Sequence, residues 1–106
     1  MNLEKLLPLS EASFYVLLAL REPRHGYAVM QQVETMSGGA VRIGPGTLYG
    51  AFTTLEKQGL IELVQEADRR KVFQLSTAGA AVVAAQVERL ALMLQAAQGK
   101  EKSCAQ

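Results

Sequence analysis

Apolar residues in the first half of the chain recur at helical spacing in three segments that turn signals separate. The segment 10–20 is apolar on most sides, and its first two residues, Ser10 and Glu11, are typical of a helix N-terminus. We therefore expect a first helix that is buried on more than one face. A second helix is predicted over 26–36, and a third follows the break Gly44-Pro45-Gly46-Thr47 and runs to about Gln58. The third helix has an inward stripe formed by Leu48, Phe52 and Leu55.

Two runs of alternating apolar and polar residues follow the third helix. Residues 60–65 and 72–76 are each typical of a short strand, and the polar stretch 66–71 between them predicts the turn of a β-hairpin. Gly59 is expected to end the preceding helix as a left-handed cap. Residues 41–43 also alternate, and they form either a very short strand or an extended link.

A long final helix is predicted from a cap at Ser76 and Thr77 to about Gln98. Apolar residues fall on it at alternating spacings of three and four, which is a heptad seam. The seam comprises Ala80, Val83, Val87, Leu90, Leu94 and Ala97. Because a short chain offers little core for the far end of this helix, we expect the seam to meet a second subunit. The alternative is packing on the first helix of the same chain alone. The expected dimer surface comprises Phe14, Leu17, Val83, Val87, Leu90 and Leu94.

These elements predict a mainly α-helical fold with a small β-hairpin (α+β), in the order of a winged helix-turn-helix followed by a long helix. The length of 106 residues and the hydrophobic content of 49% suit one compact core. Net charge is only +1. If nucleic acid is the partner, the positive charge must therefore be local, and dimerisation must double it.

Composition argues against several classes of protein. One histidine and one cysteine, Cys104, give no convincing nucleophile–base pair, and carboxylate clusters, phosphate loops and clustered metal ligands are missing. We therefore expect that the protein is not an enzyme and that it binds neither a metal nor a cofactor. The lone cysteine fits a free thiol in a reduced cytoplasm, with an intermolecular disulfide as the alternative. Apolar runs such as 15–20 are far shorter than a membrane span, so we expect a cytoplasmic protein without a membrane partner.

The outward side of the third helix carries small and hydroxylated residues. In a helix-turn-helix this helix enters the major groove of DNA, where glycines let the backbone approach closely and hydroxyls or a lysine can bind phosphates and base edges. The candidate contacts are Gly46, Thr47, Gly50, Thr53, Thr54 and Lys57. The wing tip adds Arg69, Arg70 and Lys71. Such a triplet is usually a solvated turn, but directly after a helix-turn-helix it indicates contact with phosphates or the minor groove.

Several sequence motifs, in the expected order and spacing, make residues 14–79 resemble the PadR family of winged-helix regulators. The motifs are Pro23-Arg24-His25-Gly26-Tyr27, Gly46-Thr47-Leu48-Tyr49, Leu55-Glu56-Lys57-Gln58-Gly59-Leu60-Ile61 and the segment 69–79. The short tail resembles the small subfamily, in which one C-terminal helix serves dimerisation. The resemblance implies a homodimeric repressor of its own promoter and a neighbouring gene, with release by a small-molecule effector as a further property.

The resemblance also adds residues to the candidate DNA contacts. It places His25, Gly26 and Tyr27 near the DNA backbone, where helix amides can bind phosphate. For His25 a capping or packing role is the alternative. Tyr49 either contacts phosphate or lies between the third helix and the wing.

The sequence departs from the family pattern at three positions. Gly50 stands where many members have proline, Thr54 where arginine is common, and Phe73 where tyrosine is usual. Some small members stack planar drugs on an aromatic residue of the last helix, and the predicted helix here has none. A drug pore between subunits would therefore lack its stacking partner.

Residues 1–75 are accordingly expected to form a DNA-binding domain, 76–99 a dimerisation helix and 100–106 a disordered tail. The expected partners are double-stranded DNA with a palindromic operator, a second copy of the chain and a small-molecule effector. The rival hypothesis is a winged-helix module that binds a protein and not DNA. Low net charge favours this rival, whereas the glycine-threonine face and the wing cations oppose it.

Overall fold

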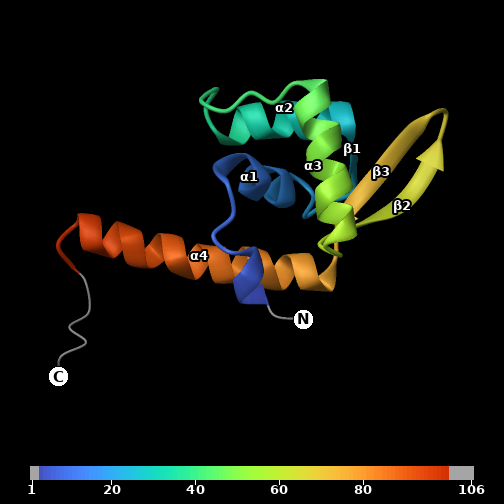
Figure 1. Ribbon diagram of the computed structural model, residues 1–106. Coiled ribbons are helices and arrows are strands. Elements are labelled where there is room, and N and C mark those ends of the chain that lie inside the picture. The colour runs from blue at the N-terminus through green and yellow to red at the C-terminus, as the bar shows by residue number, and fades with distance from the viewer. Residues whose placement is uncertain (1–2, 101–106) are drawn as a thin grey trace.

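The computed structural model describes residues 3–100, so Cys104 and the predicted tail beyond Lys100 lie outside the described residues. Three helices pack together, a β-hairpin projects from one side of them, and a long last helix runs beneath (Figure 1). The elements are η1 (Leu3–Leu6), α1 (Glu11–Ala19), β1 (Arg24–His25), α2 (Gly26–Met36), α3 (Pro45–Lys57), β2 (Ile61–Ala67), β3 (Arg70–Leu75) and α4 (Thr77–Ala97). The predicted mainly α-helical fold with a small hairpin is confirmed.

Side-chain caps begin the first and last helices where the sequence predicts them. The Ser10 hydroxyl accepts a hydrogen bond from the Ser13 amide at 3.1 Å, and the Ser76 hydroxyl accepts one from the Gly79 amide at 3.0 Å. Gly59 has φ of +75° directly after α3, which is the predicted left-handed cap. These local signals fix the helix ends before any packing is considered.

The core lies where α1, α2 and α3 meet the base of the hairpin. The predicted stripe of α3 is buried, as is the inner face of α2 around Val29 and Val33. Tyr27, which shares the helical spacing of that face, is instead 62% exposed. The main core side chains are Val16, Leu17, Leu20, Val29, Val33, Leu48, Phe52, Leu55, Leu60, Ile61, Phe73 and Val82.

The hairpin is longer and its turn tighter than the alternation predicts. Strands β2 and β3 pair antiparallel as far as Ala67 opposite Arg70. The turn therefore consists of Asp68 and Arg69 alone, both with positive φ (52° and 65°), as a two-residue hairpin turn of this twist requires. The prediction of a six-residue turn is wrong, and Arg70 and Lys71 belong to β3.

A two-residue strand that periodicity does not reveal completes the sheet. Strand β1 pairs antiparallel with β3, with Arg24 opposite Phe73 and His25 opposite Val72, so the strand order is β1-β3-β2. Two residues are too few to show an alternating pattern. Residues 41–43 form no strand, so the extended link is the correct alternative there.

Helix α4 starts inside the core and then leaves it. Val82 is fully buried, and Gln86 is also buried, with its side-chain carbonyl accepting a hydrogen bond from the Leu9 amide at 3.0 Å. Beyond this point the helix extends past the other elements (Figure 1), and its large apolar side chains are 38–58% exposed. They are Val87, Leu90, Leu92, Met93 and Leu94.

By length and composition alone, α4 could cross a membrane, although only 17% of its most apolar window is buried. Counting uninterrupted apolar residues missed this helix, because charged and polar residues interrupt its run. An exposed apolar surface of this size is typical of a surface that contacts another protein or a membrane. Packing on the first helix of the same chain leaves most of the heptad seam uncovered.

Leu17 corrects the predicted dimer surface. Its side chain is fully buried in the core of its own chain, so it has no surface to offer to a partner. Phe14, on the same helix, is partly exposed and lines a hollow between α1 and α4 together with Leu90. The error arose because α1 is apolar on most sides, so the sequence does not indicate which side faces inward.

Candidate nucleic-acid interface

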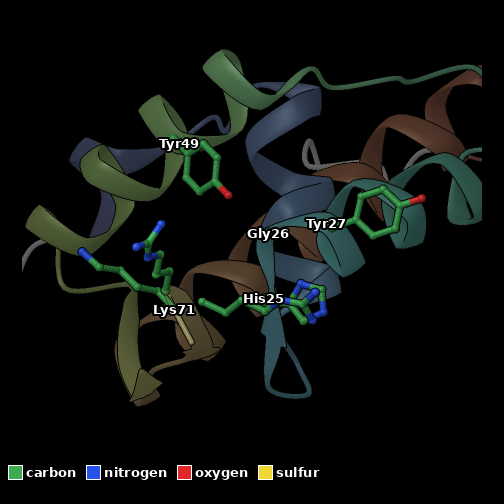
Figure 2. Close-up of a pocket in the computed structure, with 7 residues that line it drawn as sticks. His25, Gly26, Tyr27, Tyr49 and Lys71 are labelled. Carbon is green, nitrogen blue, oxygen red and sulfur yellow. The ribbon is translucent and has the colours of Figure 1, made fainter. Parts of the chain in front are cut away.

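One hollow of about 420 Å³ gathers predicted contact residues from three separate parts of the chain. The start of α2, the first half of α3 and the tip of the hairpin converge on it (Figure 2). Its lining residues are His25, Gly26, Tyr27, Tyr49, Arg69, Arg70 and Lys71. Residues 27 and 69 are more than forty positions apart in sequence, so the fold assembles this surface.

The small strand β1 explains why the start of α2 lies beside the wing. His25 pairs with Val72, the residue after Lys71, so backbone pairing holds the first turn of α2 against the cationic end of β3. The guanidinium of Arg24 strengthens this corner, because its Nε donates to the Ala19 carbonyl at 2.8 Å. The helix start and the wing therefore form one unit.

The first turns of α2 and α3 are left without side-chain caps. His25 and Gly44 occupy the N-cap positions, neither makes a side-chain cap hydrogen bond, and neither helix has an acidic residue in its first turn. Helices α1 and α4, by contrast, are capped by serine. Uncapped helix amides carry a partial positive charge and can donate hydrogen bonds to a phosphate. The His25 side chain therefore does not cap α2, and the capping alternative is wrong.

Tyr49 projects from α3 over the start of α2. Its ring packs edge-on against Phe52 at 6.1 Å, and Phe52 packs against Phe73 of β3 at 4.8 Å. A Cβ atom at Gly26 would lie 3.0 Å from the Tyr49 hydroxyl, so glycine is what allows this close passage. Figure 2 shows the hydroxyl directed toward Gly26, with Tyr27 turned away from it. Tyr49 thus lies between α3 and the start of α2 and still exposes 56% of its surface.

The predicted outward face of α3 is exposed along its whole length. It comprises Gly46, Thr47, Gly50, Thr53, Thr54 and Lys57. The Thr53 hydroxyl donates to the Tyr49 carbonyl at 3.0 Å, so it has only acceptor capacity left for a ligand. A Cβ atom at Gly46 or Gly50 would meet nothing within 4 Å. Packing therefore does not explain either glycine, although glycine within a helix costs about 0.5–1 kcal/mol.

The wing cations are free to bind an external anion. Within residues 3–100, carboxylates pair with Arg24 and Arg42, through Glu22 and Glu34, and none pairs with the three wing cations or Lys57. Glu66 stands opposite Lys71 in the strand register, yet the two side chains form no ion pair. Over the same residues, no group of three or more metal-ligating side chains comes together.

The change Gly50→Ala should raise the stability of the fold and lower its affinity for DNA. Because the added methyl meets open space and removes a helix glycine, we expect the free energy of unfolding to rise by about 0.5–1 kcal/mol. A duplex pressed against the α3 backbone has no room for that methyl, so affinity should fall about 10-fold or more. Thermal unfolding and fluorescence anisotropy measure the two effects. Unchanged affinity for DNA would show that the α3 backbone does not approach the duplex at Gly50.

The helix-turn-helix of α2 and α3 with the β2–β3 wing defines a winged helix-turn-helix protein. The chain belongs to the transcriptional regulator PadR-like family, whose family model matches residues 9–85. Members of this family are transcriptional regulators and not enzymes.

Individual relatives agree with this assignment. Over 71 residues the chain is 42% identical to an uncharacterized 37.1 kDa protein in transposon TN4556 of Streptomyces fradiae, covering 66% of this chain. It spans only 20% of that protein's length. A PadR family transcriptional regulator from Eggerthella lenta is 30% identical with a TM-score of 0.62, over 84% of this chain and 79% of that chain. A PadR-like transcription factor from Bacteroides fragilis shares the fold at 17% identity, with a TM-score of 0.71 over 93% of this chain and 98% of that one.

Proposed function

We propose that the chain is a homodimeric transcriptional repressor that binds a palindromic operator in double-stranded DNA, including its own promoter and that of a neighbouring gene, and that a small-molecule effector releases it. The observation that carries the proposal is the hollow between the start of α2, Tyr49 and the wing. It combines uncapped helix amides with cations that have no carboxylate partner within residues 3–100. This combination suits the phosphate backbone.

In the proposed complex, α3 lies in the major groove and presents Gly46, Thr47, Gly50, Thr53, Thr54 and Lys57 to it. The phosphate contacts are His25, Gly26, Tyr27, Tyr49, Arg69, Arg70 and Lys71. Residues 1–75 then supply the contacts with DNA, and 76–99 pair the subunits. The first turns of α4 also belong to the core of the DNA-binding part, because Val82 is buried in it.

The exposed seam of α4 supports the dimer. Val83, Val87, Leu90 and Leu94 lie on one side of the helix and are half-buried or exposed in the single chain. Phe14 extends this apolar surface from α1. Two subunits double a positive charge that is small in each chain, and two α3 helices spaced by one duplex turn, roughly 34 Å, match the half-sites of a palindrome.

Leu90→Glu should convert the dimer into monomers. The change buries a carboxylate without a partner in the seam, at a cost that marginal helix pairing cannot offset. Leu92→Glu is the matched control, because Leu92 is also exposed on α4 but projects from the opposite side to the seam. Sedimentation velocity should find monomers for the first variant and dimers for the second. A Leu90→Glu variant that remains dimeric would show that the α4 seam is not the dimer interface.

The function is tested by fluorescence anisotropy with the duplex upstream of the gene and a scrambled duplex, at several salt concentrations. Preference for the upstream duplex at physiological salt is the expected result. Equal, salt-sensitive binding to both duplexes would show that the protein binds DNA but does not recognise its own promoter, which would reject autoregulation. No binding by a folded dimer would reject DNA as the partner and favour the protein-interaction module.

A further inference from the structure

A second hollow lies on the opposite flank of α3 from the wing cations, between that helix, the start of α1 and the segment before it. Its volume is about 480 Å³, within the range of small-molecule sites. The floor is apolar and includes Val16, Ile43 and Leu55, which are buried. The walls are Leu6, Pro8, Leu9, Ser10, Ala12, Ser13, Thr47, Gly50, Ala51, Thr54 and Gln58.

None of the described residues that line this hollow carries a charge, although charged residues make up 20% of the chain. The wall offers hydrogen-bonding groups that the described part of the protein does not use. The hydroxyls of Ser13, Thr47 and Thr54 take part in none of the side-chain hydrogen bonds within residues 3–100. An apolar floor with free hydroxyls on the walls formed by α1 and α3 suits a ligand that has an apolar body and a few hydrogen-bonding groups.

Two residues of the α3 wall leave this hollow wide and uncharged. A Cβ atom at Gly50 would meet nothing within 4 Å, so the glycine leaves open space where a side chain would stand. Thr54 adds a hydroxyl to the wall without adding a charge. Neither residue has a packing role in the core, because both positions are exposed.

We propose that this hollow binds an uncharged small molecule with an apolar body and one or two hydrogen-bonding groups, and that the bound molecule competes with DNA for α3. Thr47, Gly50 and Thr54 belong to both surfaces, so a ligand seated here occupies space that the duplex needs. The competition rests on the proposed function. The binding site does not, because it is a property of the free protein.

Naphthalenemethanol is the probe, and naphthoate, with the same rings and a carboxylate, is its matched control. Titration into the DNA-free full chain is followed by two-dimensional amide NMR. We expect naphthalenemethanol to bind with a Kd of about 1 mM or tighter, an affinity that a ligand with this number of atoms can reach. Binding should shift the amide resonances of Ser13, Thr47, Gly50 and Thr54. Naphthoate should bind at least about 10-fold more weakly, because the walls offer its charge no partner.

Ser13→Leu tests the location, since Ser13 lies on α1, is not itself a proposed DNA contact, and a larger side chain there takes up space in the hollow. We expect it to abolish the shifts while Thr35→Leu, exposed on α2 outside this lining, preserves them. Thermal unfolding confirms that both variants are folded. Shifts that persist in Ser13→Leu, that appear instead around Phe14 and Met93, or that are equal for both probes would overturn the site.

Competition is measured separately. At ten times its Kd, naphthalenemethanol should weaken duplex binding about 10-fold for each α3 helix that it blocks, which is about 100-fold for the proposed dimer, and leave Ser13→Leu unaffected. Undiminished duplex binding by a chain that NMR shows to be loaded would refute the competition. If the protein binds no duplex at all, the proposed function fails, and the NMR titration still decides whether the site exists.

Discussion

Replacing Arg70 and Lys71 together by alanine is expected to weaken operator binding by about 100-fold or more at physiological salt. Each subunit loses two cations that lie at the hollow beside the start of α2 and have no carboxylate partner within the described residues. In a dimer four phosphate contacts disappear, so the slope of log affinity against log salt should become shallower by about 3–4. Both side chains are exposed, so the free energy of unfolding and the oligomeric state of the protein should change little.

Lys5→Ala with Lys100→Ala is the matched control for this change. It removes the same charge from exposed positions that line no part of the hollow. If long-range attraction alone held the duplex, both double variants would lose affinity alike. The expected outcome is a large loss and a shallow salt slope for the wing variant only. Wild-type affinity in Arg70→Ala with Lys71→Ala would reject the wing as a phosphate contact.

Sequence patterns predicted the helices well because the signals that fix them are local. The buried stripe of α3, the serine caps of α1 and α4 and the left-handed Gly59 depend on neighbours within a few residues. The hairpin turn was misplaced because Asp68 and Arg69 adopt positive φ without the Asn-Gly or Asp-Gly pair that usually marks such a turn. The pairing of β2 with β3 determines where the chain turns, and the identity of the turn residues does not reveal it.

The candidate site could be predicted as a set of residues but not as a surface. The motifs placed Gly26, Tyr49 and the wing triplet near DNA one by one. Their convergence depends on β1 pairing with β3 and on Gly26 passing under the Tyr49 hydroxyl, which are contacts between distant segments. Leu17 shows the same limit, because a helix that is apolar on most sides does not reveal which side the core covers.

The junction between the hairpin and α4 is equally non-local, and it governs how the two proposed halves of the molecule are joined. The Ser76 amide donates to the Leu60 carbonyl at 3.0 Å, and the Ser76 hydroxyl donates to the Gly59 carbonyl at 2.6 Å. One turn later Gly79 packs directly against Leu60. These contacts tie the direction of α4 to the end of α3. In the proposed dimer they would set the spacing of the two α3 helices.

Gly79→Ala is expected to lower the free energy of unfolding by about 3 kcal/mol or more. A Cβ atom at this position would overlap the Leu60 carbonyl oxygen and press on the Leu75 side chain. A backbone oxygen cannot rotate away as a side chain can, so α4 must separate from the hairpin or the core must open. The gain in helix propensity, about 1 kcal/mol, is too small to offset this overlap.

Urea unfolding at a fixed protein concentration measures the effect, because stability of a dimer depends on concentration. Gly50→Ala serves as the matched control, since the same methyl on α3 meets open space and should stabilise. Opposite signs for the two substitutions would tie the loss to the junction and not to glycine replacement in general. A Gly79→Ala chain within about 1 kcal/mol of wild type would mean that α4 can leave the hairpin in another direction. In that case the packing at Leu60 would not fix the spacing of the DNA-binding helices.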